Sequence, residues 1–347
     1  MRETWARARC LAAAIGMGAA LASSPASAQE AETIRIAGAY PAEHPAMRAM
    51  ARFKERAEIT TRGRLQVEVV SAEGNGDVAR LVERLRAGEM TMAVVGVGSF
   101  AEWAPELEAL TVPFLFTNRV TAFNVVDGPV VELIDVWLRR RNFHVLGYMD
   151  PGASRPITPA APIRSVADLE GLEIGLVADG RRAAALEAVG ARPVAVDGLE
   201  EAYAALQRGT LEALHAPSTA LLARAPAPAE GHISDLDPVL DFVVVVANRA
   251  LYGDLALEHK EIVARAMQEA VVWQRAAAAA AEQTALETLT DRGMRYEPLP
   301  AELRAELWKA VTGVVEEIRE RAGAEFVDAV IAEARGPTGA ERPPLRR

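Results

Sequence analysis

The amino-acid sequence predicts an α/β fold with two lobes, and three observations support that prediction. Short apolar segments alternate with amphipathic segments along most of the chain, which is typical of strands followed by helices. The 347 residues are enough for about two domains of ~150 residues each. Half of the residues are hydrophobic and a quarter are charged, as in globular proteins.

The first part of the chain predicts a regular progression of strands and helices in a largely parallel sheet. Strands are expected at 33–37, 65–70 and 92–97, and the first helix at 46–58. A second helix, flanked by glycines, is expected to begin at Asp77.

The middle of the chain predicts a second unit of the same kind, joined to the first by crossing strands. The expected strands are 145–148, 172–177, 193–196 and 242–247, and the expected helices are 181–189 and 200–208. A proline-rich connector, APAPAEG, precedes the last of these strands.

Residues 255–292 contain neither proline nor glycine and include a run of alanines, which favours helix. A continuous helix of this length would extend ~57 Å and would run along both units. The alternative is two helices with a break between them. The final residues, 336–347, are rich in proline, glycine and charge and are expected to be disordered.

The N-terminal residues 1–28 are interpreted as a cleaved secretory signal peptide. Arg2, Arg7 and Arg9 precede an apolar stretch, and Ala26 and Ala28 flank a cleavage point before Gln29. The apolar stretch is shorter than the ~20 residues that a membrane span needs. We therefore expect a periplasmic protein rather than one that keeps an anchor.

Cys10 is the only cysteine, and it lies at the start of the apolar stretch, where a lipid would not be attached. The mature chain is therefore expected to have neither disulfides nor thiol chemistry. Removal of three arginines and one glutamate would change the net charge from −10 to −12. Such an acidic chain is a poor candidate for nucleic-acid binding.

Sequence motifs of catalysis are absent. No dinucleotide or phosphate loop, HExxH or GxSxG is present, and the five histidines lack close metal-ligand spacing. We therefore predict no enzyme activity, no cofactor and no metal. An exported chain with two α/β units favours a protein that closes by a hinge around a small molecule.

Seven segments, in the same order, resemble the solute-binding proteins of TRAP (tripartite ATP-independent periplasmic) transporters. The segments are IRIAGAYPAEHP (34–45), GRLQVEVV (63–70), GDVARLVERLRAGEMTMAVV (76–95), PELEALTVPFLF (105–116), FNVVDGPV (123–130), APIRSVADLEGLEIGL (161–176) and EEAYAALQRGTLEA (200–213). Each segment is weakly specific alone, whereas their order across nearly the whole mature chain is specific.

The resemblance implies two lobes with a ligand cleft between them, a long helix that bridges both, and a membrane permease that receives the ligand. Lobe 1 would comprise 29–148 and 239–270, and lobe 2 would comprise 149–238 and 271–335. The implied ligand is an organic acid. In this family an arginine in the strand after the DLxGL turn typically grips the acid, helped by a second arginine and by an asparagine. A planar guanidinium suits this role because it pairs with both carboxylate oxygens.

The sequence departs from the family at all three of these positions. Gly175 stands in place of the strand arginine, Ser154 in place of the second arginine and Ala216 in place of the asparagine, with His215 before it. A glycine inside a strand marks a bulge or a close approach to the backbone. Gly175 is therefore expected to open space and remove charge in the cleft, so that the ligand differs or the clamp lies elsewhere.

Arg155 and His215 are the candidates for a compensating interaction. Arg155 would reach the cleft if its loop shifts; otherwise it is a solvated loop arginine. His215 would bond a ligand or accept a proton near neutral pH, or it is a structural histidine. Arg181 and Arg182 open a helix near the cleft but are expected to face water.

Five further residues are candidates for lining the cleft. Asp77 would cap a helix or meet a ligand hydroxyl or ammonium. Tyr40 and His44 follow the first strand, and Ser99 and Trp103 follow the third; the aromatic rings would enclose the ligand or belong to the core.

Two further functional interpretations stay open on the sequence alone. The chain could serve a sensor or another periplasmic partner, with or without a ligand, or it could be a periplasmic enzyme.

Overall fold

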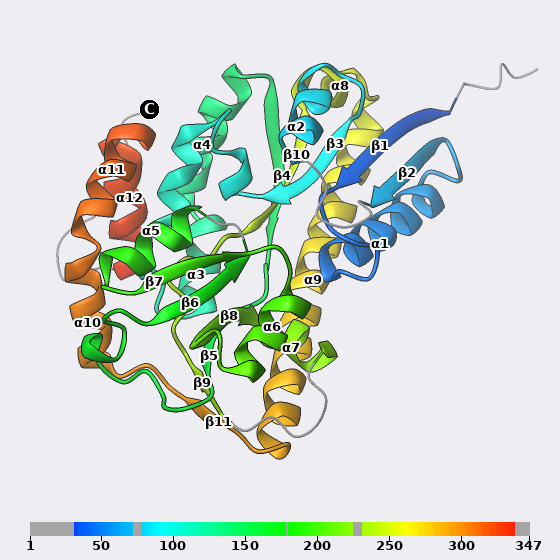
Figure 1. Ribbon diagram of the computed structural model, residues 1–347. Coiled ribbons are helices and arrows are strands. Elements are labelled where there is room, and N and C mark those ends of the chain that lie inside the picture. Colours follow the sequence, from blue (N-terminus) through cyan, green and yellow to red (C-terminus); the bar gives the residue numbers. More distant parts are fainter. Residues whose placement is uncertain (1–30, 72–77, 178–179, 225–230, 337–347) are drawn as a thin grey trace, which may run out of the picture.

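The computed structural model describes residues 31–71, 78–177, 180–224 and 231–336, which form two lobes joined by strands and one long helix (Figure 1). The predicted signal peptide, Asp77 and residues 337–347 of the predicted tail lie outside these ranges. The predicted two-lobed α/β fold is confirmed.

Lobe 1 is built on a five-stranded sheet, sheet A, with the strand order β2-β1-β3-β10-β4. Its strands are β1 (Glu32–Gly38), β2 (Leu65–Ser71), β3 (Met92–Gly96), β4 (Phe143–Met149) and β10 (Val243–Asn248). Strands β3 and β10 are buried along their whole length, which explains their continuous apolar sequences MAVVG and VVVVAN.

Helices cover both faces of sheet A and follow its strands in the chain. They are α1 (Pro45–Thr60), α2 (Val78–Arg86), α3 (Arg119–Val126), α4 (Pro129–Arg140) and α8 (Arg249–Asp254), with the 3₁₀ helices η1 (Gly98–Phe100) and η2 (Pro105–Thr111). Helix α1 begins where it does because His44 caps its first turn and Pro45 occupies the first helical position, where no amide hydrogen is needed.

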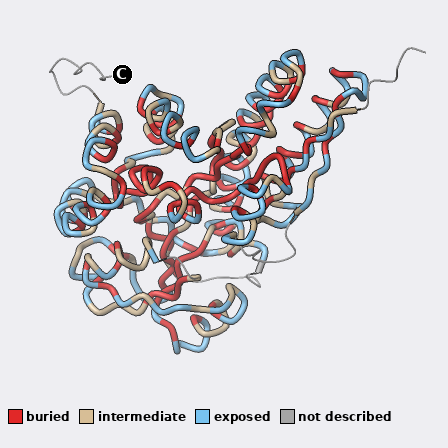
Figure 2. Tube along the Cα trace, turned by 90° about the horizontal axis from the view of Figure 1, so that it is seen from above, coloured by how far each residue is buried: buried red, intermediate tan, exposed pale blue. Residues whose placement is uncertain are grey.

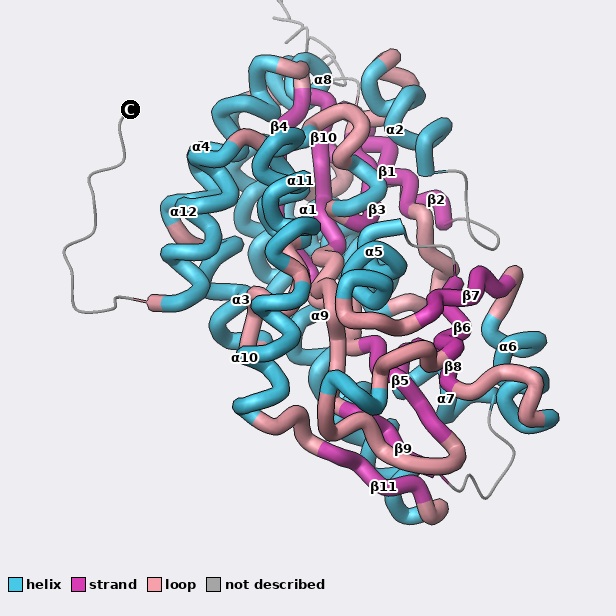
Figure 3. Tube along the Cα trace, turned by 60° about the vertical axis from the view of Figure 1, so that its left-hand side comes forward, coloured by secondary structure: helices cyan, strands magenta, loops and turns pink. Residues whose placement is uncertain are grey.

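Lobe 2 is built on a six-stranded sheet, sheet B, with the strand order β11-β9-β5-β8-β6-β7. Its strands are β5 (Ser154–Thr158), β6 (Glu173–Val177), β7 (Arg192–Val196), β8 (Ala213–Pro217), β9 (Gly231–Ser234) and β11 (Met294–Glu297). Its helices are η3 (Val166–Asp168), α5 (Gly180–Ala188), α6 (Leu199–Arg208) and α7 (Ser218–Arg224). Figure 3 shows the strands of the two sheets as two separate groups.

The predicted bridging helix is one continuous helix, α9 (Leu257–Asp291), so the alternative with a break is wrong. It packs against α1 and β4 in lobe 1 and against α7 and β11 in lobe 2, and it runs from yellow to orange in Figure 1. The chain ends with α10 (Ala301–Ala310), α11 (Thr312–Ala322) and α12 (Ala324–Arg335). Although 271–335 was expected in lobe 2, α11 and α12 pack on η2, and α12 also on α3 and α4, all of which belong to lobe 1.

The prediction of largely parallel sheets is confirmed, although each sheet contains one reversed strand. Strand β10 is antiparallel to both of its neighbours, β3 and β4, and strand β5 is antiparallel to β8 and β9. These antiparallel strands lie beside the crossings between the lobes: β5 follows the crossing from β4, and β10 follows the crossing from β9. A strand that enters a sheet from the other lobe need not run in the direction set by a βαβ unit.

The buried residues lie along the strands and the inner helix faces, shown in red in Figure 2. One apolar cluster extends from sheet A through η2 and α12 to one face of sheet B, and a separate cluster lies between the other face of sheet B and helices α6, α7 and α9. Within the described ranges, no helix is long and apolar enough to cross a membrane.

Candidate functional site

A cavity of about 490 Å³ is lined by parts of both lobes, and this size is within the range of small-molecule sites. Lobe 1 contributes η1 and the end of η2, lobe 2 contributes the first turn of α5, and α11 forms a further wall. The lining residues are Ser99, Thr111, Pro113, Gly180, Arg181, Ala184, Asp241, Val314, Glu317, Ile318 and Arg321. We call this space the interlobe cavity.

Two glycines at the end of strand β3 allow side chains from elsewhere to lie directly on the backbone. A Cβ added at Gly98 would lie 2.7 Å from Arg181 Nε and closer still to Nη2 and Cζ of the same guanidinium. A Cβ added at Gly96 would lie 2.7 Å from Asp241 Oδ2. Asp241 Oδ1 also accepts a hydrogen bond of 2.7 Å from the Gly98 amide. A lobe 2 arginine and an aspartate therefore meet on the backbone of lobe 1.

Tyr40 lies beside this point and stacks on His44, and neither residue is among those that line the interlobe cavity. Their rings stack with centroids 4.4 Å apart, and the Tyr40 hydroxyl is 3.6 Å from the position of a Cβ on Gly96. Burial, with a contribution from Asp241, raises the pKa of Tyr40. Burial lowers the pKa of His44 to about 4, so its imidazole is neutral and Nδ1 accepts a hydrogen bond from the Ala46 amide at 3.2 Å. His44 therefore caps helix α1, a role that the sequence did not predict for it.

A connector of eight residues, 235–242, joins β9 to β10 and carries three aspartates. Asp235 accepts a hydrogen bond of 2.7 Å from Arg155, and Asp237 accepts one of 3.3 Å from the Ser154 amide. Asp237 is buried, which raises its pKa, although the arginines around it, Arg182 foremost, act in the opposite direction. Asp241 is the residue at Gly98. The connector thus places a carboxylate at each of three points between the lobes.

Ser154, which the resemblance places at a clamp position, contacts His215, which precedes another such position, Ala216. Ser154 Oγ lies 2.8 Å from His215 Nδ1, and His215 Nε2 has no hydrogen-bond partner among the described residues. Burial, together with the charges of Arg182 and Arg155, lowers the pKa of His215 well below its usual value. The lowered pKa disfavours the alternative in which His215 takes up a proton near neutral pH. The pair presents a hydroxyl and a neutral imidazole instead of a guanidinium.

Arg155 is neither a solvated loop residue nor directed at the interlobe cavity. It is 9% exposed and lies in strand β5, where its guanidinium pairs with Asp235 and with Glu282 of α9. Although burial opposes the charge, these two carboxylates raise the pKa of Arg155 further. Glu282 also accepts a hydrogen bond of 2.6 Å from Arg119 of lobe 1. Arg155 therefore belongs to a buried network that joins the two lobes to the long helix.

Gly175 does not open space in the cleft. A Cβ added there would lie 2.5 Å from Leu211 Cδ2 and 3.5 Å from the Ala213 carbonyl oxygen. Leu211 belongs to the apolar cluster beneath α6 and α7. The close approach that a glycine in a strand indicates is thus made by Leu211, and the expectation of an open space is wrong.

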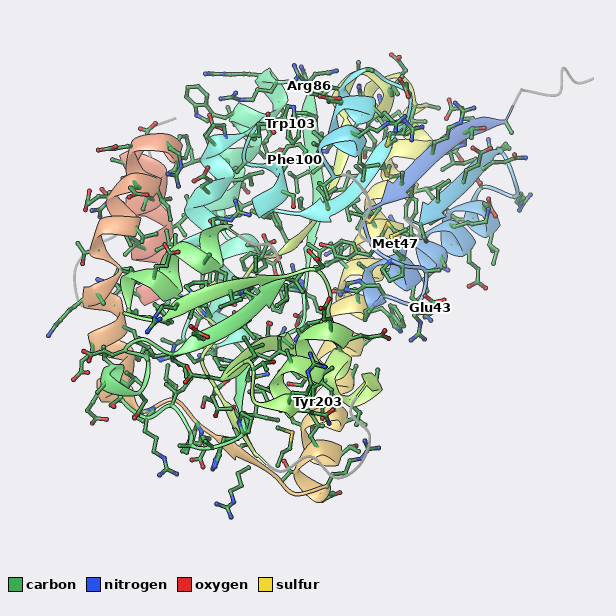
Figure 4. All side chains as sticks on the ribbon, viewed as in Figure 1. Glu43, Met47, Arg86, Phe100, Trp103 and Tyr203 are labelled. Carbon is green, nitrogen blue, oxygen red and sulfur yellow. The ribbon has the colours of Figure 1, made fainter. Side chains whose placement is uncertain are left out.

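The remaining candidates divide between the cavity and the core. Ser99 is exposed and lines the interlobe cavity. Trp103 packs on Phe100 with ring centroids 6.4 Å apart, and Figure 4 shows both residues in the upper lobe, away from the lower one. Trp103 therefore belongs to the core of lobe 1 and does not enclose a ligand. Asp77 lies outside the described residues.

Sequence reasoning set aside Arg181 and missed the aspartates of the connector. The signal for Arg181 was its position at the start of a helix that follows a strand, because such positions face the edge where ligands bind in α/β sheets. The signal for the connector was the run DLDPVLD directly before an apolar strand. Among the described residues, no group of three or more His, Cys, Asp or Glu side chains is arranged to hold a metal ion.

Comparison with known proteins identifies the family. The sequence pattern of the bacterial extracellular solute-binding protein family 7 matches residues 36–322. The chain belongs to this family. The C4-dicarboxylate-binding periplasmic protein of Rhodobacter capsulatus is 25% identical to it over 330 residues, which cover 93% of this chain and 98% of the relative.

Solved structures of TRAP periplasmic solute-binding proteins share the fold of this family member. The protein from Ochrobactrum anthropi, with its C-terminus bound in its ligand-binding pocket, has a TM-score of 0.79 at 24% identity and covers 88% of this chain and 95% of its own. The protein from Sulfitobacter, with bound β-D-galacturonate, has a TM-score of 0.73 at 19% identity and covers 88% of this chain and 99% of its own. The predicted resemblance to TRAP-type solute-binding proteins is confirmed, and the chain is a periplasmic solute-binding protein.

Proposed function

We propose that this chain captures a small organic acid between its two lobes and delivers it to a TRAP membrane permease. The signal peptide, residues 1–28, would direct export and be cleaved before Gln29. The protein would bind and release its ligand without a chemical step. Lobe boundaries near 148 and 238 are part of the proposal, with α11 and α12 assigned to lobe 1.

The observation that carries the proposal is the interlobe cavity itself. Ser99 and Thr111 come from lobe 1, whereas Gly180, Arg181 and Ala184 come from lobe 2. A ligand held there would contact both lobes only when they are closed. Such a ligand favours the closed state by its differential affinity, and closure then presents a single surface to a permease.

An organic acid is supported by the relatives and by the local charge. The relative from Rhodobacter is named for C4-dicarboxylates, and the Sulfitobacter structure holds a sugar acid. Although the mature chain would be strongly acidic, the first turn of α5 brings Arg181 and the positive end of a helix dipole to the cavity. Both features favour a carboxylate.

A thermal-shift screen of residues 29–347 tests the proposal. Succinate and D-galacturonate are compared with the neutral sugar D-galactose and with a neutral amino acid. A ligand that binds only the folded state at 100 times its Kd stabilises it by ~2.7 kcal/mol, which raises the melting temperature measurably. We expect a saturable shift with at least one of the two acids and none with D-galactose. A shift with none of the acids, or turnover of any of them, would contradict the proposal.

Genes for small and large permease subunits beside the gene for this chain would support delivery to a permease.

A further inference from the structure

Three helix ends of lobe 1 meet where Asn142 and Asn248 contact each other. Asn142 Nδ2 donates a hydrogen bond of 3.2 Å to Asn248 Oδ1. Asn248 Nδ2 donates one of 2.8 Å to the Leu85 carbonyl oxygen of α2. The Arg249 amide donates one of 2.8 Å to the Asn142 carbonyl oxygen. Because Asn142 follows α4 and Asn248 caps α8, these bonds hold the end of α2, the end of α4 and the start of α8 together.

This junction lies at the edge of sheet A opposite the interlobe cavity. Asn248 pairs with Phe143, the first residue of β4, and β3 begins at the same edge. Ser99, which lines the cavity, follows the other end of β3. Figure 4 shows Arg86 at the top of the upper lobe, on the side away from lobe 2. A partner bound at the junction would therefore leave the cavity free.

The ends of α2 and α4 and the start of α8 carry six exposed arginines, which are Arg84, Arg86, Arg139, Arg140, Arg141 and Arg249. Three of them pair with one carboxylate each, Arg84 with Glu89, Arg139 with Asp135 and Arg141 with Glu106. The other three, Arg86, Arg140 and Arg249, form no ion pair with any residue that the structure describes. Even when Glu83 of α2 is included, six arginines against four carboxylates leave a positive surface, in a chain whose net charge is −10.

Helix dipoles explain only part of this arrangement. An arginine in the last turn of a helix compensates the partial negative charge there, which explains the arginines at the ends of α2 and α4. Arg249, however, occupies the first position of α8, where a cation faces the partial positive charge of the helix. Helix stability therefore does not explain Arg249, whereas an anionic partner at the junction does.

Two exposed apolar side chains adjoin these arginines. Val136 is 49% exposed and Trp137 is 37% exposed, and both lie in the second half of α4. The Arg140 guanidinium lies 4.5 Å from the centre of the Trp137 ring. Arginine beside exposed tryptophan is typical of surfaces that lie at a membrane–water interface, where the cation meets anionic headgroups and the ring lies at headgroup level. We call Arg86, Arg140, Arg249, Val136 and Trp137 the junction patch.

We propose that the junction patch binds the anionic headgroups of a phospholipid membrane and thereby holds lobe 1 at the membrane surface. An acidic protein segment would also attract the arginines, but the exposed valine and tryptophan favour a lipid surface. Each arginine beside an anionic surface increases the affinity only about fivefold, so the contact is expected to be weak and reversible. It would concentrate the protein at the membrane without occupying the interlobe cavity.

The test is sedimentation of residues 29–347 with lipid vesicles at low salt. Vesicles of phosphatidylcholine mixed with an equal amount of phosphatidylglycerol are compared with vesicles of phosphatidylcholine alone. We expect binding to the anionic vesicles only, and we expect its loss at about 1 M salt, where charges are screened within ~3 Å.

The decisive variant replaces Arg86, Arg140 and Arg249 with glutamine. It should weaken binding to the anionic vesicles on the order of 100-fold. The matched control removes the same charge from lobe 2 by replacing Arg208, Arg292 and Arg295, which also form no ion pair with a described residue. The control should bind at least ten times more tightly than the decisive variant, and thermal melting checks that both are folded.

Trp137→Ser supplies a second, independent variant, which should weaken vesicle binding without a change of charge. If this variant unfolds the protein, the arginine variants still decide the question. Equal binding by the decisive variant and its control would overturn the inference, as would wild-type protein that binds no vesicles. Binding of a polyglutamate peptide but not of vesicles would overturn the assignment to lipid. Because the patch and the cavity lie at opposite edges of sheet A, these outcomes do not depend on whether the cavity binds an acid.

Discussion

Arg155 of strand β5 and Glu282 of helix α9 form a buried ion pair that joins lobe 2 to the helix shared by both lobes. Their side chains are 11% and 9% exposed, and the same carboxylate also accepts hydrogen bonds from Arg119 of lobe 1 and from the Ala153 amide. Glu282 is therefore the point at which both lobes are held to α9. Two arginines pair with it, and each of them also pairs with a second carboxylate, Arg155 with Asp235 and Arg119 with Asp150.

Glu282→Ala should lower the free energy of unfolding by at most roughly 3–5 kcal/mol, because it breaks a buried ion pair but leaves Arg155 with Asp235 and Arg119 with Asp150. Urea unfolding followed by circular dichroism measures the change. Glu287 lies on the same helix but is exposed, so Glu287→Ala should change the free energy of unfolding by no more than ~0.5 kcal/mol. Equal effects of the two substitutions would show that the network contributes little.

Gly175→Ala should destabilise the protein by about 1–3 kcal/mol, because the new methyl group would overlap with Leu211. The penalty should largely disappear in a Leu211→Ala background, and a double-mutant cycle measures this coupling. Gly313→Ala is the control, since Gly313 lies in helix α11 with nothing near a new Cβ, and there alanine should stabilise by ~0.5–1 kcal/mol. A Gly175→Ala variant as stable as the wild type would contradict the contact with Leu211.

The sequence predicted that Gly175 lies in a strand but not which side chain contacts it, and the other strands show the same limit. Periodicity and apolar content placed β1, β2, β3, β6, β7 and β10 close to their observed bounds. All of these strands pack on the core except β7, an edge strand whose residues are exposed or half-buried. Strands β5 and β8, with the sequences SRPIT and ALHAP, contain proline, arginine or histidine and become strands by pairing with each other and with their outer neighbours β9 and β6. Their strand conformation is set by tertiary contacts, which no local pattern reports.

In the candidate site, too, local features could be predicted from the sequence, whereas contacts between distant residues could not. Tyr40 and Ser99 were predicted to lie near the cleft because they follow strands, and position along a strand is a local property. The contact of Arg181 with Gly98 and the ion pairs of Arg155 join residues that are distant in the sequence. A single sequence therefore indicates which residues approach the cleft, but not which carboxylate already neutralises an arginine.

His44 should make the protein less stable as the pH falls from about 6.5 to about 4. Its pKa in the folded protein, about 4, is below the ordinary value of 6.5, so the unfolded chain binds the additional proton in this window. Stability contributed by neutral His44 is therefore complete above this window and is lost as the pH falls through it.

His44→Asn keeps a side chain that can cap α1 but does not titrate, so it should flatten the pH dependence by at most ~1.4 kcal/mol per pH unit. Urea unfolding at several pH values between 4 and 7 measures the slope for both proteins. His215 is unchanged in both, so its contribution cancels from the comparison. Identical slopes would show that His44 is not held neutral in the folded protein.

Capture of the ligand between the lobes is tested most directly by hydrogen exchange of residues 29–347 with and without saturating succinate or D-galacturonate, whichever gives the larger thermal shift. The two decisive segments are the end of β3 with η1, residues 96–103, and the first turn of α5 with the residues that follow it, 180–188. We predict that the acid slows exchange in both segments together, while the outer helix α6 is unaffected. Protection of only one lobe, or of neither, would contradict capture between the lobes.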